Sequence, residues 1–204
     1  MASETSRSGD NVIWNFPNVV SMTRLGFGFI MFAMIPLGFY WAALVLFVVA
    51  ASTDWLDGWY ARKYNQVTKF GRILDPFCDK ILIIGAFVLL AEAMVEYPLY
   101  CRVAGWMAVV VIGRELLVTS IRGLVEQGGG DFSAKMHGKI KMWLQCFAVG
   151  FALLVLAVFG TTPDLEARSP QLLWILALLL WAAVVYTLYS GWQYVLQARS
   201  VLGF

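Results

Sequence analysis

Residues 54–79 have the sequence DWLDGWYARKYNQVTKFGRILDPFCD, which places four aspartates inside an otherwise strongly apolar chain. Helical periodicity puts the first part of this stretch on one helix face, because its polar and small residues are three or four positions apart. That face comprises Asp54, Asp57, Gly58, Ala61 and Arg62. The same spacing puts Gly71, Asp75 and Asp79 on one face of the next helix. The sequence therefore predicts two helix faces that each combine acids with small residues.

Four carboxylates held close together repel one another unless cations neutralise them. Neither histidine nor cysteine completes a ligand set, so hard divalent ions that prefer oxygen are expected, Mg²⁺ first and Mn²⁺ second. Two such ions about 3.5–4 Å apart can clamp a phosphoryl oxygen between them. The small residues would let a large polar ligand approach the backbone, and Arg62 could bind two of its phosphate oxygens. The plainer alternative is that the acids are solvated or paired with nearby basic residues, but it does not explain the small residues beside them.

The same residues resemble the signature of a known family. The pattern D-x-x-D-G-x-x-A-R, eight residues, G-x-x-x-D-x-x-x-D is typical of the CDP-alcohol phosphatidyltransferases, and every fixed position matches. The resemblance implies a homodimeric membrane enzyme of six helices, in which the acids bind two divalent ions and the CDP diphosphate. It also implies that Asp79 serves as the base for an attacking hydroxyl. Spacing alone does not separate a metal ligand from a base.

A second family motif, P-N-x-x-S-x-x-R, begins at Pro17. It places Ser21 and Arg24 one helical turn apart, where both could reach the nucleotide or its phosphates. An arginine that extends to lipid headgroups explains the spacing equally well.

Composition predicts an integral membrane protein. The chain has 204 residues, of which 60% are hydrophobic and 14% charged, with a mean hydropathy of +0.72. Its apolar runs of about 20 residues match the thickness of a bilayer. The size suits a single domain over residues 1–204, and the net charge of +2 is too small to suggest nucleic-acid binding. Residues 1–16 lack the order of a secretory signal, so we expect them to be retained as a mobile or interfacial segment.

The expected fold is all-α, a bundle of six transmembrane helices with a short N-terminal interfacial helix over residues 12–24. The expected spans are residues 20–37, 41–60, 72–91, 103–124, 140–160 and 171–195. Pro76 is expected in the opening turn of the third span. With the N-terminus inside, all of the fifteen Lys and Arg residues except Arg102 and Arg168 fall toward the cytoplasm. The acidic faces and both termini then lie on the cytoplasmic side of the cell (inner) membrane.

Basic residues of the fourth and fifth spans suggest a second site. Arg114 lies by count well inside the hydrocarbon region, so it should face a partner or a polar cavity. Pairing with Glu115 is expected to be poor, because neighbours in sequence point to different sides of a helix. A lysine cluster often marks topology and headgroup contact, but the arginines beside it also predict an anion site. The candidate residues are Arg114, Arg122, Lys135, Lys139 and Lys141.

A diphosphate site beside lipid suits CDP-diacylglycerol as the donor. Within the family the chain is most similar to members whose acceptor is glycerol 3-phosphate, through the stretch at 54–71 and the segments GRELLVTSIR and GKIK. A phosphorylated acceptor needs a second cationic pocket. Inositol phosphate would meet that requirement too, and phosphatidylglycerol is a further alternative. A cation or proton transporter is the alternative from another class, but its acids should be spread along a route through the bilayer.

Overall fold

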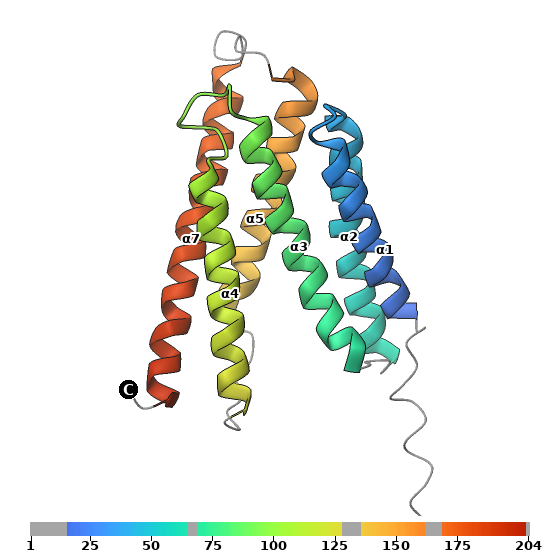
Figure 1. Cartoon of the computed structure of the whole chain (residues 1–204), viewed down its shortest axis with the longest axis vertical. Coiled ribbons are helices and arrows are strands. Elements are labelled where there is room, and N and C mark those ends of the chain that lie inside the picture. Colours follow the sequence, from blue (N-terminus) through green and yellow to red (C-terminus); the bar gives the residue numbers. More distant parts are fainter. Residues whose placement is uncertain (1–15, 65–68, 128–135, 162–168, 203–204) are drawn as a thin grey trace, which may run out of the picture. The chain divides into compact units, whose positions relative to one another are not determined.

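The computed structural model of the chain describes residues 16–64, 69–127, 136–161 and 169–202 (Figure 1). These residues form six helices and no strand, which confirms the all-α prediction for the part described. The helices are α1 (Phe16–Met34), α2 (Tyr40–Tyr64), α3 (Lys69–Ala93), α4 (Gly105–Gln127), α5 (Met136–Phe159) and α7 (Pro170–Leu202).

The chain divides into two compact units, Met1–Gly85 and Ala86–Phe204, and the boundary falls within α3. In the first unit α1 packs along α2, and in the second α4 and α5 each pack against α7 (Figure 1). A single domain over the whole chain stays a prediction.

The turn between α1 and α2 is a Schellman motif. The N–H of Phe39 donates to the carbonyl of Met34 at 3.0 Å, and the N–H of Gly38 donates to that of Ile35 at 3.0 Å. Gly38 has a φ of 77°, which glycine adopts without the steric cost that a Cβ brings. The motif satisfies carbonyls at the end of α1 and returns the chain directly into α2.

Close packing joins α1 to α3 in the first unit. The ring of Phe32 lies directly on the backbone of Gly85, where an added Cβ would be 2.2 Å from the ring. An added Cβ at Gly28 would lie 3.2 Å from Leu82. These glycines let α1 approach α3 closely; Gly28 lies four residues after Arg24, and Gly85 lies six residues after Asp79.

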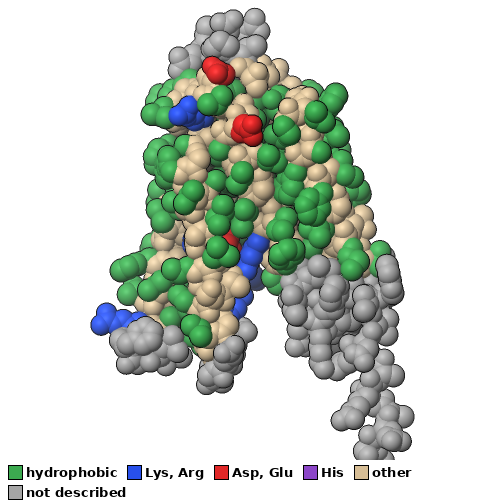
Figure 2. All heavy atoms as spheres, viewed as in Figure 1, with side chains coloured by type: hydrophobic (Ala, Val, Ile, Leu, Met, Phe, Trp, Pro, Cys, Tyr) green, Lys and Arg blue, Asp and Glu red, His purple; other side chains and the backbone are tan. Residues whose placement is uncertain are grey.

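Figure 2 shows hydrophobic side chains spread over the described part of the face that it draws. Large apolar residues are exposed along several helices, among them Val45, Trp143 and Leu178. Of the described helices, two are long and apolar enough to cross a bilayer, Gly138–Phe159 and Pro170–Arg199, while Val19–Met34 and Tyr40–Thr53 form shorter apolar stretches. Exposed apolar surface of this kind suits lipid, and the six-span topology stays a prediction.

Two local expectations were wrong. Pro76 lies inside α3, seven residues after its first residue Lys69, because the helix extends back beyond the apolar run. There the proline removes the hydrogen bond that residue 76 would donate to the carbonyl of residue 72. Residues 16–24 do not form a separate interfacial helix but the first turns of α1, and residues 12–15 lie outside the described residues.

Candidate active site

Arg24 of α1 and Asp79 of α3 form an ion pair. Nη1 of Arg24 donates to Oδ1 of Asp79 at 2.8 Å, and the side chains are 1% and 26% exposed. The thiol of Cys78 donates to the carbonyl of Ser21 at 3.6 Å in the same contact between the helices. A buried guanidinium is costly without a charged partner, so the pair fixes both side chains. Asp79 is the member that reaches the surface.

Ser21 is fully buried and Arg24 nearly so. The ion pair joins Arg24 of the first motif to Asp79 of the second, a contact that neither motif predicted by itself. Contact of Ser21 or Arg24 with a nucleotide stays a prediction.

The four predicted acids are distributed over α2 and α3 at matching distances from the connection between them. Asp54 is ten residues before the end of α2, and Asp79 is ten residues after the start of α3. Asp57 and Asp75 are seven and six residues from the same ends. At about 1.5 Å per residue these offsets are roughly 15 Å for Asp54 and Asp79 and roughly 9–11 Å for Asp57 and Asp75. Figure 1 shows α2 and α3 running in opposite directions, so the acids of the two helices have matching offsets from the connection, Asp54 with Asp79 and Asp57 with Asp75.

The other residues predicted at this site lie on the same two helices. Gly58, Ala61 and Arg62 belong to the last part of α2, and Gly71 to the first turn of α3. The side chains of residues 54–75 lie outside the described part, and no group of three or more metal-binding side chains occurs among those described. The donor set nevertheless consists of carboxylate oxygens, which fits Mg²⁺ or Mn²⁺ rather than a metal that prefers nitrogen or sulfur.

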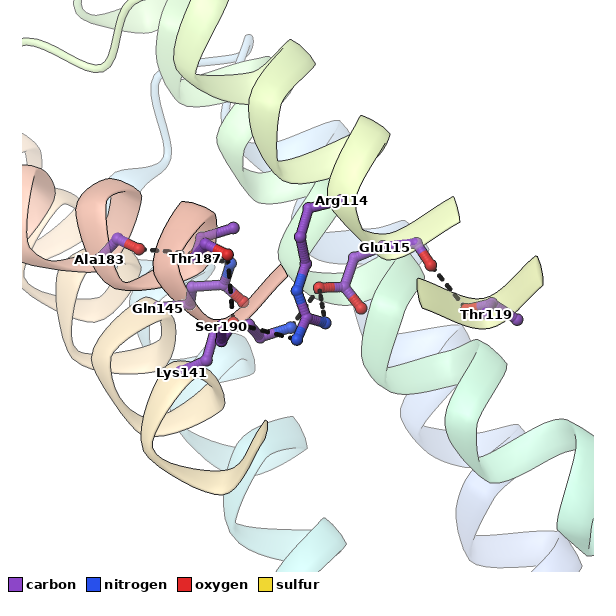
Figure 3. Close-up of polar contacts among 8 residues, drawn as sticks. All are labelled: Arg114, Glu115, Thr119, Lys141, Gln145, Ala183, Thr187 and Ser190. Carbon is purple, nitrogen blue, oxygen red and sulfur yellow. Dashed lines mark hydrogen bonds and ion pairs between the residues drawn. The ribbon is translucent and has the colours of Figure 1, made fainter. Parts of the chain in front are cut away.

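A second charged group, which we call the basic cluster, consists of Arg114, Glu115 and Lys141 (Figure 3). Nη1 of Arg114 lies 3.2 Å from Oε1 of Glu115, and Nζ of Lys141 donates to the same oxygen. The three side chains are only 8%, 8% and 9% exposed. Two cations thus share one carboxylate, and the three formal charges sum to +1.

The expectation that Arg114 and Glu115 would pair poorly was wrong. Their helix positions do diverge, but Lys141 from α5 holds the Glu115 carboxylate, and the long Arg114 side chain reaches round to it. Pairing of sequence neighbours is possible when a third charge from another helix fixes one of them.

Arg114 also rests against α7, a contact that sequence reasoning missed. Nη2 of Arg114 donates to Oγ of Ser190 at 3.1 Å, and its guanidinium carbon lies 5.5 Å from the ring centre of Tyr194. An added Cβ at Gly191 would come within 3.0 Å of Arg114 Cγ. Nε of Arg114 is buried and has no hydrogen-bond partner among the described residues.

One helical turn before Ser190, the hydroxyl of Thr187 joins α7 to α5. The amide of Gln145 donates to Oγ1 of Thr187 at 2.9 Å, and that hydroxyl donates to the carbonyl of Ala183 at 2.6 Å. Thr187 and Ser190 are three residues apart in an apolar helix, a spacing that could have indicated a polar stripe facing other helices.

The remaining basic residues predicted at the second site are not all brought together. Arg122 lies eight residues beyond Arg114 on α4, about 12 Å along the axis, and its Nε is buried without a hydrogen-bond partner among the described residues. Lys139 is exposed, whereas Lys141, two residues later, is buried in the basic cluster. Lys135 lies outside the described residues.

Comparison with known proteins identifies the same family that the sequence motifs resemble, over most of the chain. A family model described as CDP-alcohol phosphatidyltransferase matches residues 14–189. Several similar proteins are named CDP-diacylglycerol–glycerol-3-phosphate 3-phosphatidyltransferase. The protein of Bacillus subtilis (strain 168) is 35% identical over 197 residues, 89% of this chain and 94% of its own length. That of Yersinia enterocolitica is 33% identical over 169 residues, 79% and 86% of the two chains, and that of Salmonella choleraesuis is 30% identical over 197 residues, 93% and 97%.

Proposed function

This chain belongs to the CDP-alcohol phosphatidyltransferase family, and we propose that it transfers the phosphatidyl group of CDP-diacylglycerol to glycerol 3-phosphate. The products are phosphatidylglycerophosphate and CMP, so the enzyme serves phospholipid biosynthesis. The names of relatives that align over most of this chain support the reaction. The structural observation that carries the choice of acceptor is the basic cluster, whose excess positive charge suits a substrate with its own phosphate.

In the proposed reaction the acceptor hydroxyl attacks the phosphorus that carries the diacylglycerol. A new oxygen–phosphorus bond forms, the bond from that phosphorus to the oxygen shared with CMP breaks, and CMP leaves with the electron pair. Asp79 takes the proton of the attacking hydroxyl. Arg24, 2.8 Å from Asp79, holds the carboxylate in a fixed orientation, and the partial exposure of Asp79 leaves it accessible to the acceptor.

Asp54, Asp57, Asp75 and Asp79 would hold two divalent ions, of Mg²⁺ or Mn²⁺ type. When bound, the ions would supply positive charge to the diphosphate and to the departing CMP phosphate. The matching offsets of the acids from the connection between two antiparallel helices support this set. Residues proposed to border the diphosphate are Ser21, Arg24, Gly58, Ala61, Arg62 and Gly71.

The acceptor phosphate is proposed to bind Arg114 and Lys141 of the basic cluster. Arg122, Lys135 and Lys139 would add positive charge around it. A guanidinium offers two parallel donors to a phosphate, and an ammonium adds a compact charge. Glu115 keeps the two cations together when their charges would otherwise repel.

We further propose that the protein crosses the cell (inner) membrane six times as a homodimer of single-domain chains. Both termini and the active site would face the cytoplasm. The apolar helices and exposed hydrophobic residues support a membrane location, and the distribution of Lys and Arg supports the orientation.

The reaction is tested by incubating purified protein with CDP-diacylglycerol, magnesium and one acceptor at a time, and measuring CMP release. We expect release with glycerol 3-phosphate that stops when the divalent ion is chelated and resumes when Mg²⁺ or Mn²⁺ is added. Faster release with inositol phosphate or phosphatidylglycerol would reassign the acceptor. No release with any acceptor would reject the proposed function.

A further inference from the structure

We infer that Ser190 and Gly191 of α7 are positioning residues for the acceptor, acting through Arg114. The inference rests on the proposed function, because it takes Arg114 as a phosphate-binding residue. Neither α7 residue belongs to the motifs at residues 17–24 and 54–79 or to the basic segments of α4 and α5. Both are buried in the second unit beside the basic cluster.

The side-chain oxygen of Ser190 accepts a hydrogen bond from Arg114, and it is held in one orientation. Its hydroxyl donates to the carbonyl of Thr187 at 3.1 Å, which commits its only proton. The oxygen can then only accept, and it accepts from Nη2 of Arg114 at 3.1 Å. Since Nη1 lies against Glu115, the two ends of the guanidinium are held from α4 and from α7 (Figure 3).

Gly191 provides the space for the Arg114 side chain. A Cβ at this position would lie 3.0 Å from Arg114 Cγ and 3.9 Å from Nε. The first distance is shorter than an ordinary carbon–carbon contact of about 3.5–4 Å, so a side chain at 191 would push the stem of Arg114 away. The ring of Tyr194, 5.5 Å from the guanidinium carbon, limits movement on another side.

The stem and tip of Arg114 are therefore both fixed before any phosphate binds. A preorganised guanidinium loses less conformational freedom on binding, which strengthens recognition without a new contact. Displacing a positioned group by a fraction of an ångström weakens that recognition, because the two donors no longer point at the same phosphate oxygens.

The test compares two glycine-to-alanine variants. Gly191→Ala adds the Cβ that meets Arg114, whereas Gly113→Ala adds one on α4, next to Arg114 in sequence, where nothing described lies within 4 Å. Both changes raise helix propensity equally, so their difference reports the contact. We expect Gly191→Ala to raise the KM for glycerol 3-phosphate about tenfold and to leave the KM for CDP-diacylglycerol within about twofold. Gly113→Ala should change neither.

Substitutions of Ser190 test the inference independently. Ser190→Ala should raise the KM for glycerol 3-phosphate about tenfold. Ser190→Thr keeps a hydroxyl, so its KM for glycerol 3-phosphate should stay close to that of the wild type. Thr187→Val is the matched control, because Thr187 bonds Gln145 and not Arg114; it should lower the melting temperature without changing either KM. If Gly191→Ala does not fold, Ser190→Ala decides the question, since it only removes an atom.

These outcomes are distinguishable from failure of the proposed function. If the wild-type protein does not use glycerol 3-phosphate, the proposed function fails. If it does, and if Ser190→Ala and every folded Gly191→Ala preparation keep the wild-type acceptor KM, the positioning role is overturned. Equal increases in the KM for both substrates would show that the two residues have a structural role only. Loss of active protein with both KM values unchanged would show the same. Either outcome would also overturn the positioning role.

Discussion

The Arg24–Asp79 pair and the basic cluster both place charges in buried surroundings, but they balance those charges differently. In the first, one guanidinium meets one carboxylate at 2.8 Å. In the second, Arg114 and Lys141 share the single carboxylate of Glu115. A one-to-one pair is suited to holding a reactive carboxylate in place, whereas a pair of cations around one acid still attracts an anion. This difference fits the proposed function, in which the α1–α3 region acts on the donor and the α4–α5–α7 region binds the acceptor phosphate.

The largest effect is expected at the acids of the first region. Asp75→Asn, or Asp57→Asn, should abolish CMP release, because a lost carboxylate weakens both divalent-ion binding and the charge stabilisation that the ions supply. That stabilisation is worth several kcal/mol, more than about a thousandfold in rate. CMP release by the purified, folded variants at ordinary magnesium concentrations measures it. Near-normal release would reject the proposed two-ion site.

Asp79→Asn should lower turnover more than substrate binding, unlike the substitutions of Asp57 and Asp75. If Asp79 is the base, the variant should lose about 10²- to 10⁴-fold in kcat while CDP-diacylglycerol binding is reduced much less. Turnover and equilibrium binding of a CDP nucleotide, measured on the same preparation, separate the two. Parallel losses of binding and rate would leave Asp79 as a metal ligand only.

The Arg24–Asp79 pair itself can be broken in a double-mutant cycle. Arg24→Met should destabilise the protein by about 1–3 kcal/mol, less than a fully buried pair would give because Asp79 is 26% exposed. Adding Asp79→Asn should recover much of that loss without restoring activity, since the uncompensated charge is then gone. Unfolding in detergent measures the coupling. Strictly additive effects would mean that the pair does not contribute to stability.

In the second region the two lysines of the GKIK segment provide a matched comparison. Lys141→Gln should lower kcat/KM for glycerol 3-phosphate about ten- to a hundredfold, because it removes a charge-assisted contact worth roughly 1.5–3 kcal/mol. Lys139→Gln should lower it less than about threefold, because Lys139 is exposed. Kinetics in detergent without anionic lipid measure both. The opposite order would place the acceptor outside the basic cluster.

The two regions also differ in how far sequence could predict them. The acids at residues 54–79 follow helical spacing within two consecutive helices, so their shared faces were predictable from local geometry. The pair between Arg24 and Asp79 spans 55 positions and that between Arg114 and Ser190 spans 76, and no local period reports such contacts.

Helix ends were also less predictable than helix existence. The apolar run marks the part of a helix that suits lipid, but the hydrogen-bonded helix continues into polar residues. Thus α2 extends to Tyr64 rather than residue 60, and α3 begins at Lys69 rather than residue 72. By contrast, the turn that follows α1 depends on a single residue, Gly38, because glycine accepts a positive φ without steric cost.

The division of labour between the two regions is tested most directly by the kinetics of Arg114→Gln with each substrate varied in turn. Arg114 belongs to the basic cluster alone, so its loss should affect only the acceptor. We predict that the KM for glycerol 3-phosphate rises about ten- to a hundredfold while the KM for CDP-diacylglycerol stays within about twofold. An unchanged acceptor KM, or equal increases for both substrates, would contradict the account.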